Sequence, residues 1–202
     1  IMVPENYKYA INELPEMKSA IHDWYKNRYN VELTYDEMIC LQGSQEALST
    51  LFLAMCDPGD IVLVPDPYYP IFSDGPKIAG AKVEYMPLLQ ENNYVIQLDQ
   101  IDEEIAKKAK MMIVSYPNNP TCAIAPDSFY EELIQFAKKY DIVVLHDNAY
   151  SELVFDGKVG KSFLSFEGAK EIGIELNSFS KTYGMADADR DYTSEDMRTL
   201  LI

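Results

Sequence analysis

The sequence has few of the residues that bind metals or form disulfides. It contains 3 cysteines and 2 histidines in 202 residues, and Cys40, Cys56 and Cys122 lie far apart. Neither His22 nor His146 stands at a zinc-ligand spacing from them, so we expect no metal site. An odd number of scattered cysteines favours reduced, mostly buried thiols.

Basic residues and long apolar runs are also scarce. Lysine and arginine number 17 against 33 acidic residues, which gives a formal net charge of -16. This charge repels nucleic acid and anionic membranes, so we expect neither as a partner. Runs such as 111–114 and 142–145 are far shorter than the roughly 20 residues of a membrane helix. The first residues lack the pattern of a secretory signal, so we expect a cytoplasmic location.

Apolar residues make up 48% of the chain, enough to build a sizeable core. Helical spacing of apolar residues predicts a first helix at about 14–29, and β-prone runs alternate with helical stretches beyond it. The expected strands are 38–41, 61–64, 82–86, 111–115, 142–145 and 172–176, and the expected helices are 45–56, 69–79, 98–109 and 127–140. This alternation predicts an α/β fold, a mainly parallel sheet with helices on both faces, in three α/β/α layers.

Polar clusters follow five of the expected strands. They are Gly43-Ser44-Gln45, Asp66-Pro67-Tyr68-Tyr69, Asn118-Asn119-Pro120-Thr121, Asp147-Asn148-Ala149-Tyr150 and Ser178-Phe179-Ser180-Lys181. In open α/β sheets, ligands bind at the carboxyl ends of the strands. The clusters therefore predict one shared site.

Each cluster taken singly also has an ordinary structural explanation. Gly43-Ser44-Gln45 is either a phosphate cradle or a plain helix N-cap. Tyr69 either stacks on a flat ring or packs in a turn. Asp147 is either a buried counter-ion of a protonated heterocycle or a turn cap, and Lys181 is either a Schiff-base amine or a solvated charge. Their convergence at one sheet edge favours the ligand-binding interpretation.

Five motifs stand in a fixed order along the chain. They are Gly-Ser-Gln-Glu-Ala-Leu, Asp-Pro-Tyr-Tyr-Pro, Tyr-Pro-Asn-Asn-Pro-Thr, His-Asp-Asn-Ala-Tyr and Asn-Ser-Phe-Ser-Lys-Thr-Tyr-Gly-Met-Ala. In this combination the sequence resembles the fold-type I pyridoxal-phosphate aminotransferases. The resemblance implies a cofactor-binding large domain at 1–186 and a divergent tail at 187–202, which turns apolar only at 200–202. The family's small domain, with its arginine for the substrate carboxylate, is not evident in the sequence.

The resemblance also implies a role for each site residue. Lys181 would hold pyridoxal 5'-phosphate as a Schiff base and, once displaced by the substrate amine, move the Cα proton. Asp147 would pair with the ring nitrogen, Tyr69 would stack on the ring, and Asn119 and Tyr150 would hydrogen-bond its phenolic oxygen. The implied phosphate ligands are the amides of Ser44 and Gln45, the side chains of Ser178 and Ser180, and Tyr7 from the neighbouring subunit of a homodimer.

The implied reaction is ping-pong transfer of an amino group between an amino acid and a 2-oxo acid. The same fold and lysine motif also serve carbon–sulfur lyases, and related domains act as ligand sensors or dimerisation modules without catalysis, so these alternatives stay open. Among the positions that depart from the family pattern are Asn12, which replaces a usual glycine, Cys122 and Asp189. Cys122 stands where a turn glycine is usual, and we expect backbone strain there. Asp189 stands where an arginine is expected, with Arg190 one position later, and its charge would oppose phosphate binding.

Overall fold

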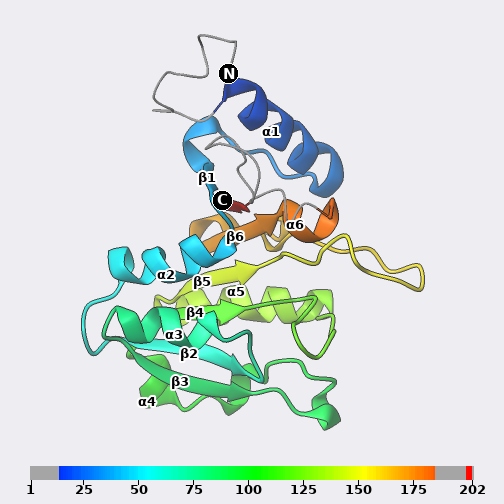
Figure 1. Ribbon diagram of the computed structural model, residues 1–202. Coiled ribbons are helices and arrows are strands. Elements are labelled where there is room, and N and C mark those ends of the chain that lie inside the picture. Colours follow the sequence, from blue (N-terminus) through cyan, green and yellow to red (C-terminus); the bar gives the residue numbers. More distant parts are fainter. Residues whose placement is uncertain (1–13, 185–198, 202) are drawn as a thin grey trace.

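One mainly parallel sheet organises the computed structural model, which describes residues 14–184 and 199–201. Its strands are β1 (Ile39–Leu41), β2 (Ile61–Asp66), β3 (Lys82–Pro87), β4 (Ala109–Val114), β5 (Val143–Asp147), β6 (Gly173–Ser178) and β7 (Thr199–Leu201). They lie in the order β1-β7-β6-β5-β4-β2-β3. The pairs from β3 through β2, β4 and β5 to β6 are all parallel, and their arrowheads point the same way in Figure 1. The predicted α/β class is confirmed.

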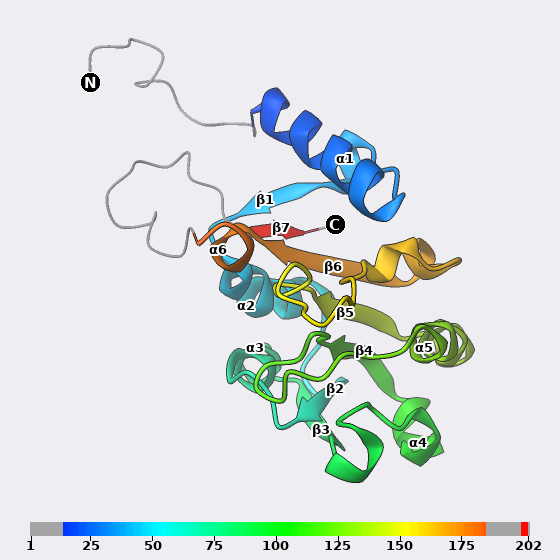
Figure 2. The same cartoon turned by 90° about the vertical axis from the view of Figure 1, so that its right-hand side faces the viewer.

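Helices cover both faces of the sheet. They are α1 (Pro15–Tyr29), α2 (Ser44–Met55), α3 (Ile71–Ile78), α4 (Glu103–Ala106), α5 (Asp127–Tyr140) and α6 (Phe179–Thr182), with 3-10 turns at Tyr35–Glu37, Gln90–Asn92, Leu98–Gln100, Phe163–Ser165 and Ala169–Glu171. Figure 2 shows α2 and α3 on one side of the sheet and α4 and α5 on the other. Among these described helices, none combines the length and apolar character needed to cross a bilayer.

Two hydrophobic cores, one on each face, follow from the two-residue period of the strands. On β4, Met111 and Ile113 pack with α2 and α3, whereas Met112 and Val114 pack with α1 and α5. All four side chains are fully buried. A central parallel strand that helices cover on both faces is made almost entirely of apolar residues. This is why the sequence predicted β4.

The prediction of one helix at 98–109 is wrong. The chain makes a 3-10 turn at Leu98–Gln100, becomes extended at Ile101, and starts α4 only after Asp102. The Asp102 carboxylate accepts hydrogen bonds from the amides of Glu104 and Ile105, which makes Asp102 a helix N-cap. The cap fixes a new helix start inside the expected helix, and β4 then begins at Ala109.

The end of the chain contributes a strand that the polar composition of the tail did not predict. β7 lies between β1 and β6 and is antiparallel to both. Asn177 of β6 pairs in register with Leu200, and Cys40 of β1 pairs with the same residue from the other side. β7 therefore joins the first strand to the parallel part of the sheet.

Candidate active site

The carboxyl ends of the parallel strands bring most of the predicted site residues to one edge. Asp147 is the last residue of β5, and β6 ends at Ser178 and runs directly into α6, which carries Lys181. The loop after β5, yellow in Figure 1, projects beyond the arrowheads of the strands. The five polar clusters therefore follow strands as expected, with β5 extending two residues further than predicted, as far as Asp147.

Asp147 is the most strongly perturbed acid at this edge. Its side chain is 7% exposed, and its Oδ1 has no hydrogen-bond partner among the described residues. Burial raises the pKa of the carboxyl from 3.8 to about 6, while the positive charges of His146 and Lys181 and the amide of Ala149 act in the opposite direction. The carboxylate accepts the Ala149 amide, as in the turn-cap alternative, and its second oxygen, which has no partner among the described residues, also suits a protonated ring nitrogen.

Tyr150 links Asp147 to the other ring-binding candidates. Burial raises the pKa of the Tyr150 hydroxyl most, followed by the negative charge of Asp147 and then by Tyr69, while a side-chain hydrogen bond with Asn119 lowers it. Tyr69 in turn accepts a hydrogen bond from the side-chain amide of Gln45. These contacts join residues that follow β1, β2, β4 and β5, so the predicted convergence holds for the described part of the site.

The start of α2 has the features of an anion site. Gly43 is the N-cap, with φ +85, and no side chain of a described residue caps the amides of the helix. A Cβ at Gly43 would meet nothing within 4 Å. Gly43 is thus the helix N-cap, as the ordinary interpretation of this motif expects, and Ser44 is the first helical residue. Free N-terminal amides, an open approach and the helix dipole together suit a phosphate.

Ser178 and Ser180 lie where β6 passes into α6, just before Lys181. The Ser178 hydroxyl accepts a hydrogen bond from the Ser180 amide at 3.3 Å, so Ser178 caps the short helix α6. Leu176, just before Ser178 on β6, packs in the same core as α2. Lys181 is exposed, and its charge reaches Asp147. Tyr7, Asp189 and Arg190 lie outside the described residues.

Cys122 adopts a backbone conformation that favours glycine, the residue that is usual at this position in the family pattern. Its φ is +59, in the left-handed region, and its side chain is exposed. Other residue types adopt this conformation only at some cost. The predicted strain at this position therefore follows from the left-handed backbone, which the structure shows at Cys122.

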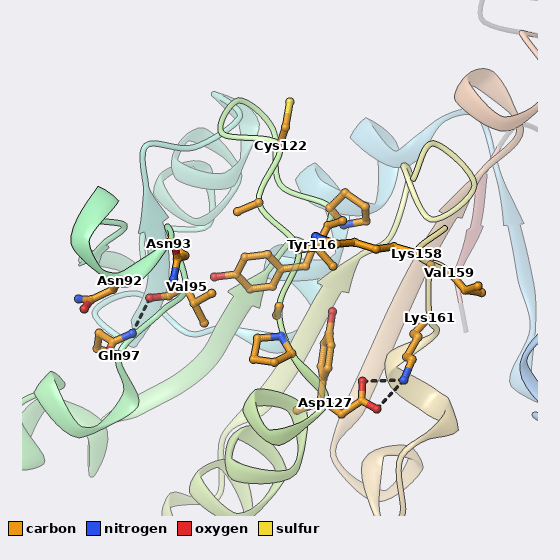
Figure 3. A pocket seen from close by; sticks show the side chains of 17 residues that line it. Asn92, Asn93, Val95, Gln97, Tyr116, Cys122, Asp127, Lys158, Val159 and Lys161 are labelled. Atoms are coloured by element: carbon orange, nitrogen blue, oxygen red, sulfur yellow. Dashed lines mark hydrogen bonds and ion pairs between the residues drawn. The ribbon is translucent and has the colours of Figure 1, made fainter. Parts of the chain in front are cut away.

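Two cavities flank the loop that contains Cys122. One of about 530 Å³ is lined by Asn119 and Tyr150 and adjoins the predicted site. The other, of about 880 Å³, contains none of the described site residues. Figure 3 shows it between Tyr116 and the ion pair of Lys161 with Asp127. We take the smaller cavity as the one related to the chemistry, because Asn119 and Tyr150 line it.

A buried carboxylate on β6 was missed by the sequence analysis. Glu175 is fully buried and lies opposite His146 in the register of β5 and β6. The contacts of Glu175 with Tyr25, His146, Ser162 and Phe163 are 2.7 to 2.9 Å long. The available signal was a glutamate between Ile174 and Leu176 in the otherwise apolar run 172–176. Within the described ranges, no group of three His, Cys, Asp or Glu residues could hold a metal ion.

The chain is similar to aminotransferases over most of its length. A sequence model of the family "Aminotransferase class I and II" matches residues 4–188. The LL-diaminopimelate aminotransferase of Halothermothrix orenii is 50% identical over 184 residues, which are 90% of this chain and 47% of that protein. The enzyme of the same name from Moorella thermoacetica is 45% identical, with the same coverage.

Solved structures give the same result. BacF from Bacillus subtilis superimposes with a TM-score of 0.91 at 36% identity, covering 100% of this chain and 49% of BacF. An aminotransferase from Staphylococcus aureus superimposes with a TM-score of 0.90 at 32% identity, covering 100% of this chain and 51% of that one. The chain thus spans about half the length of the relatives it matches.

Proposed function

Because the chain belongs to the class I and II aminotransferase family, we propose that its protein transfers an amino group between an amino acid and a 2-oxo acid, with pyridoxal 5'-phosphate as cofactor. The observation that carries the proposal is the buried Asp147 carboxylate, whose Oδ1 lacks a partner among the described residues and whose pKa Lys181 influences. A carboxylate and an amine arranged in this way suit a cofactor with a basic ring nitrogen and an aldehyde.

Different residues would bind the phosphate, the ring and the phenolic oxygen of the cofactor. The amides at the start of α2, which include those of Ser44 and Gln45, would bind the phosphate. Tyr69 would lie against the ring, held in place by Gln45. Asn119 and Tyr150 would hydrogen-bond the phenolic oxygen. Ser178 and Ser180 are further candidates for the phosphate, and their contribution is proposed on the resemblance alone.

Two residues would act on protons. The bound cofactor supplies an electron sink for the negative charge that develops at the substrate Cα. Asp147, as a carboxylate, would hold the proton on the ring nitrogen, because a buried negative charge favours the protonated partner. The amine of Lys181 would bond covalently to the cofactor at rest, and would carry the Cα proton when a substrate amine has displaced it.

We further propose LL-diaminopimelate as the amino-acid substrate. The support is the identity of 50% and 45% to two proteins named LL-diaminopimelate aminotransferase. A homodimer, with Tyr7 reaching the phosphate of the neighbouring subunit, and a cytoplasmic location are proposed with it. The carbon–sulfur lyase alternative is not favoured, because these relatives are named aminotransferases.

Borohydride labelling tests the cofactor assignment. The chain is incubated with pyridoxal phosphate, its visible absorbance is recorded, and the sample is reduced and mapped by peptide mass spectrometry. We expect the label on Lys181, the same label in Lys158→Ala, and no label at position 181 in Lys181→Ala. Lys158 is a suitable control because it is an exposed lysine on the loop after β5. A label elsewhere in the wild-type chain would overturn the assignment of Lys181.

The amino-donor assay tests the reaction. The protein is supplied with LL-diaminopimelate and a panel of 2-oxo acids, and the new amino acid and free ammonia are both quantified. Transamination yields a new amino acid without ammonia. Ammonia release without a new amino acid would support the lyase alternative and contradict the proposal.

A further inference from the structure

The larger cavity, of about 880 Å³, has a buried hydroxyl on its wall. Tyr130 of α5 lines this cavity and is only 4% exposed, with its ring stacked on Phe166 at 4.8 Å. Among the described residues, none makes a hydrogen bond with its hydroxyl. The fully buried polar atoms that lack a partner do not include this oxygen, so it reaches the open space of the cavity. A buried donor without a protein partner is available to a ligand.

Lys158 supplies a positive charge to the same cavity. It lies on the loop after β5, where its amide donates a hydrogen bond to the Phe155 carbonyl at 3.2 Å. Its ammonium makes no hydrogen bond or salt bridge within the described part of the chain. Figure 3 shows its side chain pointing from this loop toward the Tyr116 side of the cavity. Lys161, by contrast, donates to the Asp127 carboxylate at 2.6 Å, so Lys158 is the lysine of this cavity that is free to bind an anion.

Apolar and amide side chains make up most of the remaining lining. Val95, Ile124 and Val159 provide apolar surface. Figure 3 shows Asn92 and Asn93 across the cavity from Lys158, and their side-chain amides make no hydrogen bond with another described residue. A concave site of this volume, mainly apolar and with a few polar groups, is typical of small-molecule binding. The lining therefore suits a ligand with an anionic end and an apolar stem.

We propose that the larger cavity is a second binding site, which takes a small organic monocarboxylate. The carboxylate would bind the Lys158 ammonium and the Tyr130 hydroxyl, and the carbon chain would lie against the apolar lining. One free ammonium balances one negative charge. A doubly charged phosphate would be repelled more strongly, because Asp127 lines the same cavity and the chain has a net charge of -16. A carboxylate is therefore favoured over a phosphate.

This second site borders the proposed cofactor site but does not overlap with it. Cys122 and Lys158 are among the residues that line both the larger cavity and the smaller one beside Asn119. The turn that carries Asn119 is closed by its own hydrogen bond, from the Cys122 amide to the Asn118 carbonyl at 2.8 Å. A carboxylate in the larger cavity would therefore contact this turn without occupying the place of the cofactor.

Titration of the cofactor-free chain with hexanoate, followed by ¹H–¹⁵N NMR, tests for the site. Hexanoate has one carboxylate and an apolar stem, and hexanamide has nearly the same shape without the charge. We expect saturable shifts in the segments that line the cavity, 92–97, 116–130 and 158–161. The dissociation constant should be about 1 mM for hexanoate and about tenfold higher for hexanamide. Equal affinity for the two probes, shifts without saturation, or tighter binding of inorganic phosphate in this cavity would overturn the proposal.

Two substitutions test the assigned contacts. Lys158→Met removes the charge but keeps an apolar side chain, and it should weaken hexanoate binding by about tenfold or more. Tyr130→Phe removes only the hydroxyl and should weaken binding by about threefold to tenfold. The matched control is Lys108→Met, because Lys108 is exposed just before β4 and does not line this cavity; it should leave the affinity unchanged. Unchanged affinity in Lys158→Met refutes the proposal.

The outcome is independent of the cofactor assignment. Lys158→Ala is expected to keep the borohydride label on Lys181, so loss of carboxylate binding and loss of cofactor attachment are separate results. If hexanoate does not bind while Lys181 is labelled, the second site is refuted and the proposed function stands. If Tyr130→Phe does not fold, the wild-type titration and Lys158→Met decide, because Lys158 is exposed and lies outside the core.

Discussion

Replacing Asp147 by asparagine should stabilise the cofactor-free chain at neutral and alkaline pH. Burial raises the pKa of the folded carboxyl from 3.8 to about 6, so the folded state binds this proton more tightly than the unfolded state does. The favourable contribution of that proton is complete below pH 3.8 and is lost as the pH rises through about 6. Above that pH the wild-type chain must bury a charge, which asparagine avoids.

The magnitude follows from the separation of the two pKa values. A difference of about two units, at 1.36 kcal/mol each, corresponds to about 3 kcal/mol in the free energy of unfolding at pH 8. At pH 5 the unfolded carboxyl is ionised and the folded one is largely protonated, so the difference falls to about 1.5 kcal/mol. The asparagine oxygen can still accept the hydrogen bond from the Ala149 amide that lowers the pKa of Asp147. The advantage of the variant should therefore roughly double between pH 5 and pH 8.

Urea denaturation of the cofactor-free proteins at the two pH values measures this difference. Asp99→Asn is the matched control, because Asp99 is exposed in the turn before α4 and its replacement should change stability little. Adding pyridoxal phosphate should reduce the difference in the free energy of unfolding between Asp147→Asn and the wild-type chain. A ligand that pairs with the Asp147 carboxylate stabilises the wild-type chain more than the variant. Equal stabilities at pH 8, or one constant difference at both pH values, would refute the reasoning.

Three further substitutions are tested by urea denaturation at pH 7. Cys122→Gly should stabilise the chain by about 0.5 to 1 kcal/mol, because relief of the left-handed backbone outweighs the added freedom of the unfolded chain; a loss would contradict this. Tyr25→Phe should destabilise it by about 1 to 3 kcal/mol by removing a donor from buried Glu175, and an unchanged midpoint would count against that network. Gly75→Ala should destabilise it by about 2 kcal/mol or more, since its Cβ would lie 1.9 Å from the Leu48 carbonyl oxygen; wild-type stability would show that α2 and α3 can separate freely.

Local sequence patterns predicted the central parallel strands well because most residues of β2, β4 and β5 are apolar and turn residues flank these short runs. The helix at 98–109 was predicted wrongly because periodicity does not reveal where a helix restarts. That boundary depends on one carboxylate, Asp102, which accepts two amide hydrogen bonds. β7 was not predicted for a different reason. It has only three residues, and its strand conformation depends on pairing with β1 and β6, which lie far away in the sequence.

The site was predictable to the extent that its residues occur in motifs at strand ends. Asp147, Tyr150 and Lys181 each follow an apolar run, and the parallel sheet brings such ends together. Contacts between the clusters, such as Gln45 with Tyr69, needed the structure, because they join elements far apart in the sequence. The fixed motif order revealed the family, whereas the spacing of residues within a motif did not reveal how buried each side chain is.

Glu175 illustrates why burial and not residue type decides the chemistry of this edge. In the sequence it is one of 33 acidic residues and has no distinguishing spacing. It becomes a buried, hydrogen-bonded side chain because the register of β5 and β6 sets it opposite His146, and because α1 brings in Tyr25 from 150 positions away. The same burial makes Asp147 costly for the folded chain and strongly attractive to a cation. A stability gain for Asp147→Asn would therefore have its physical origin in the low polarity of the sheet interior, which disfavours the charged form of the carboxyl.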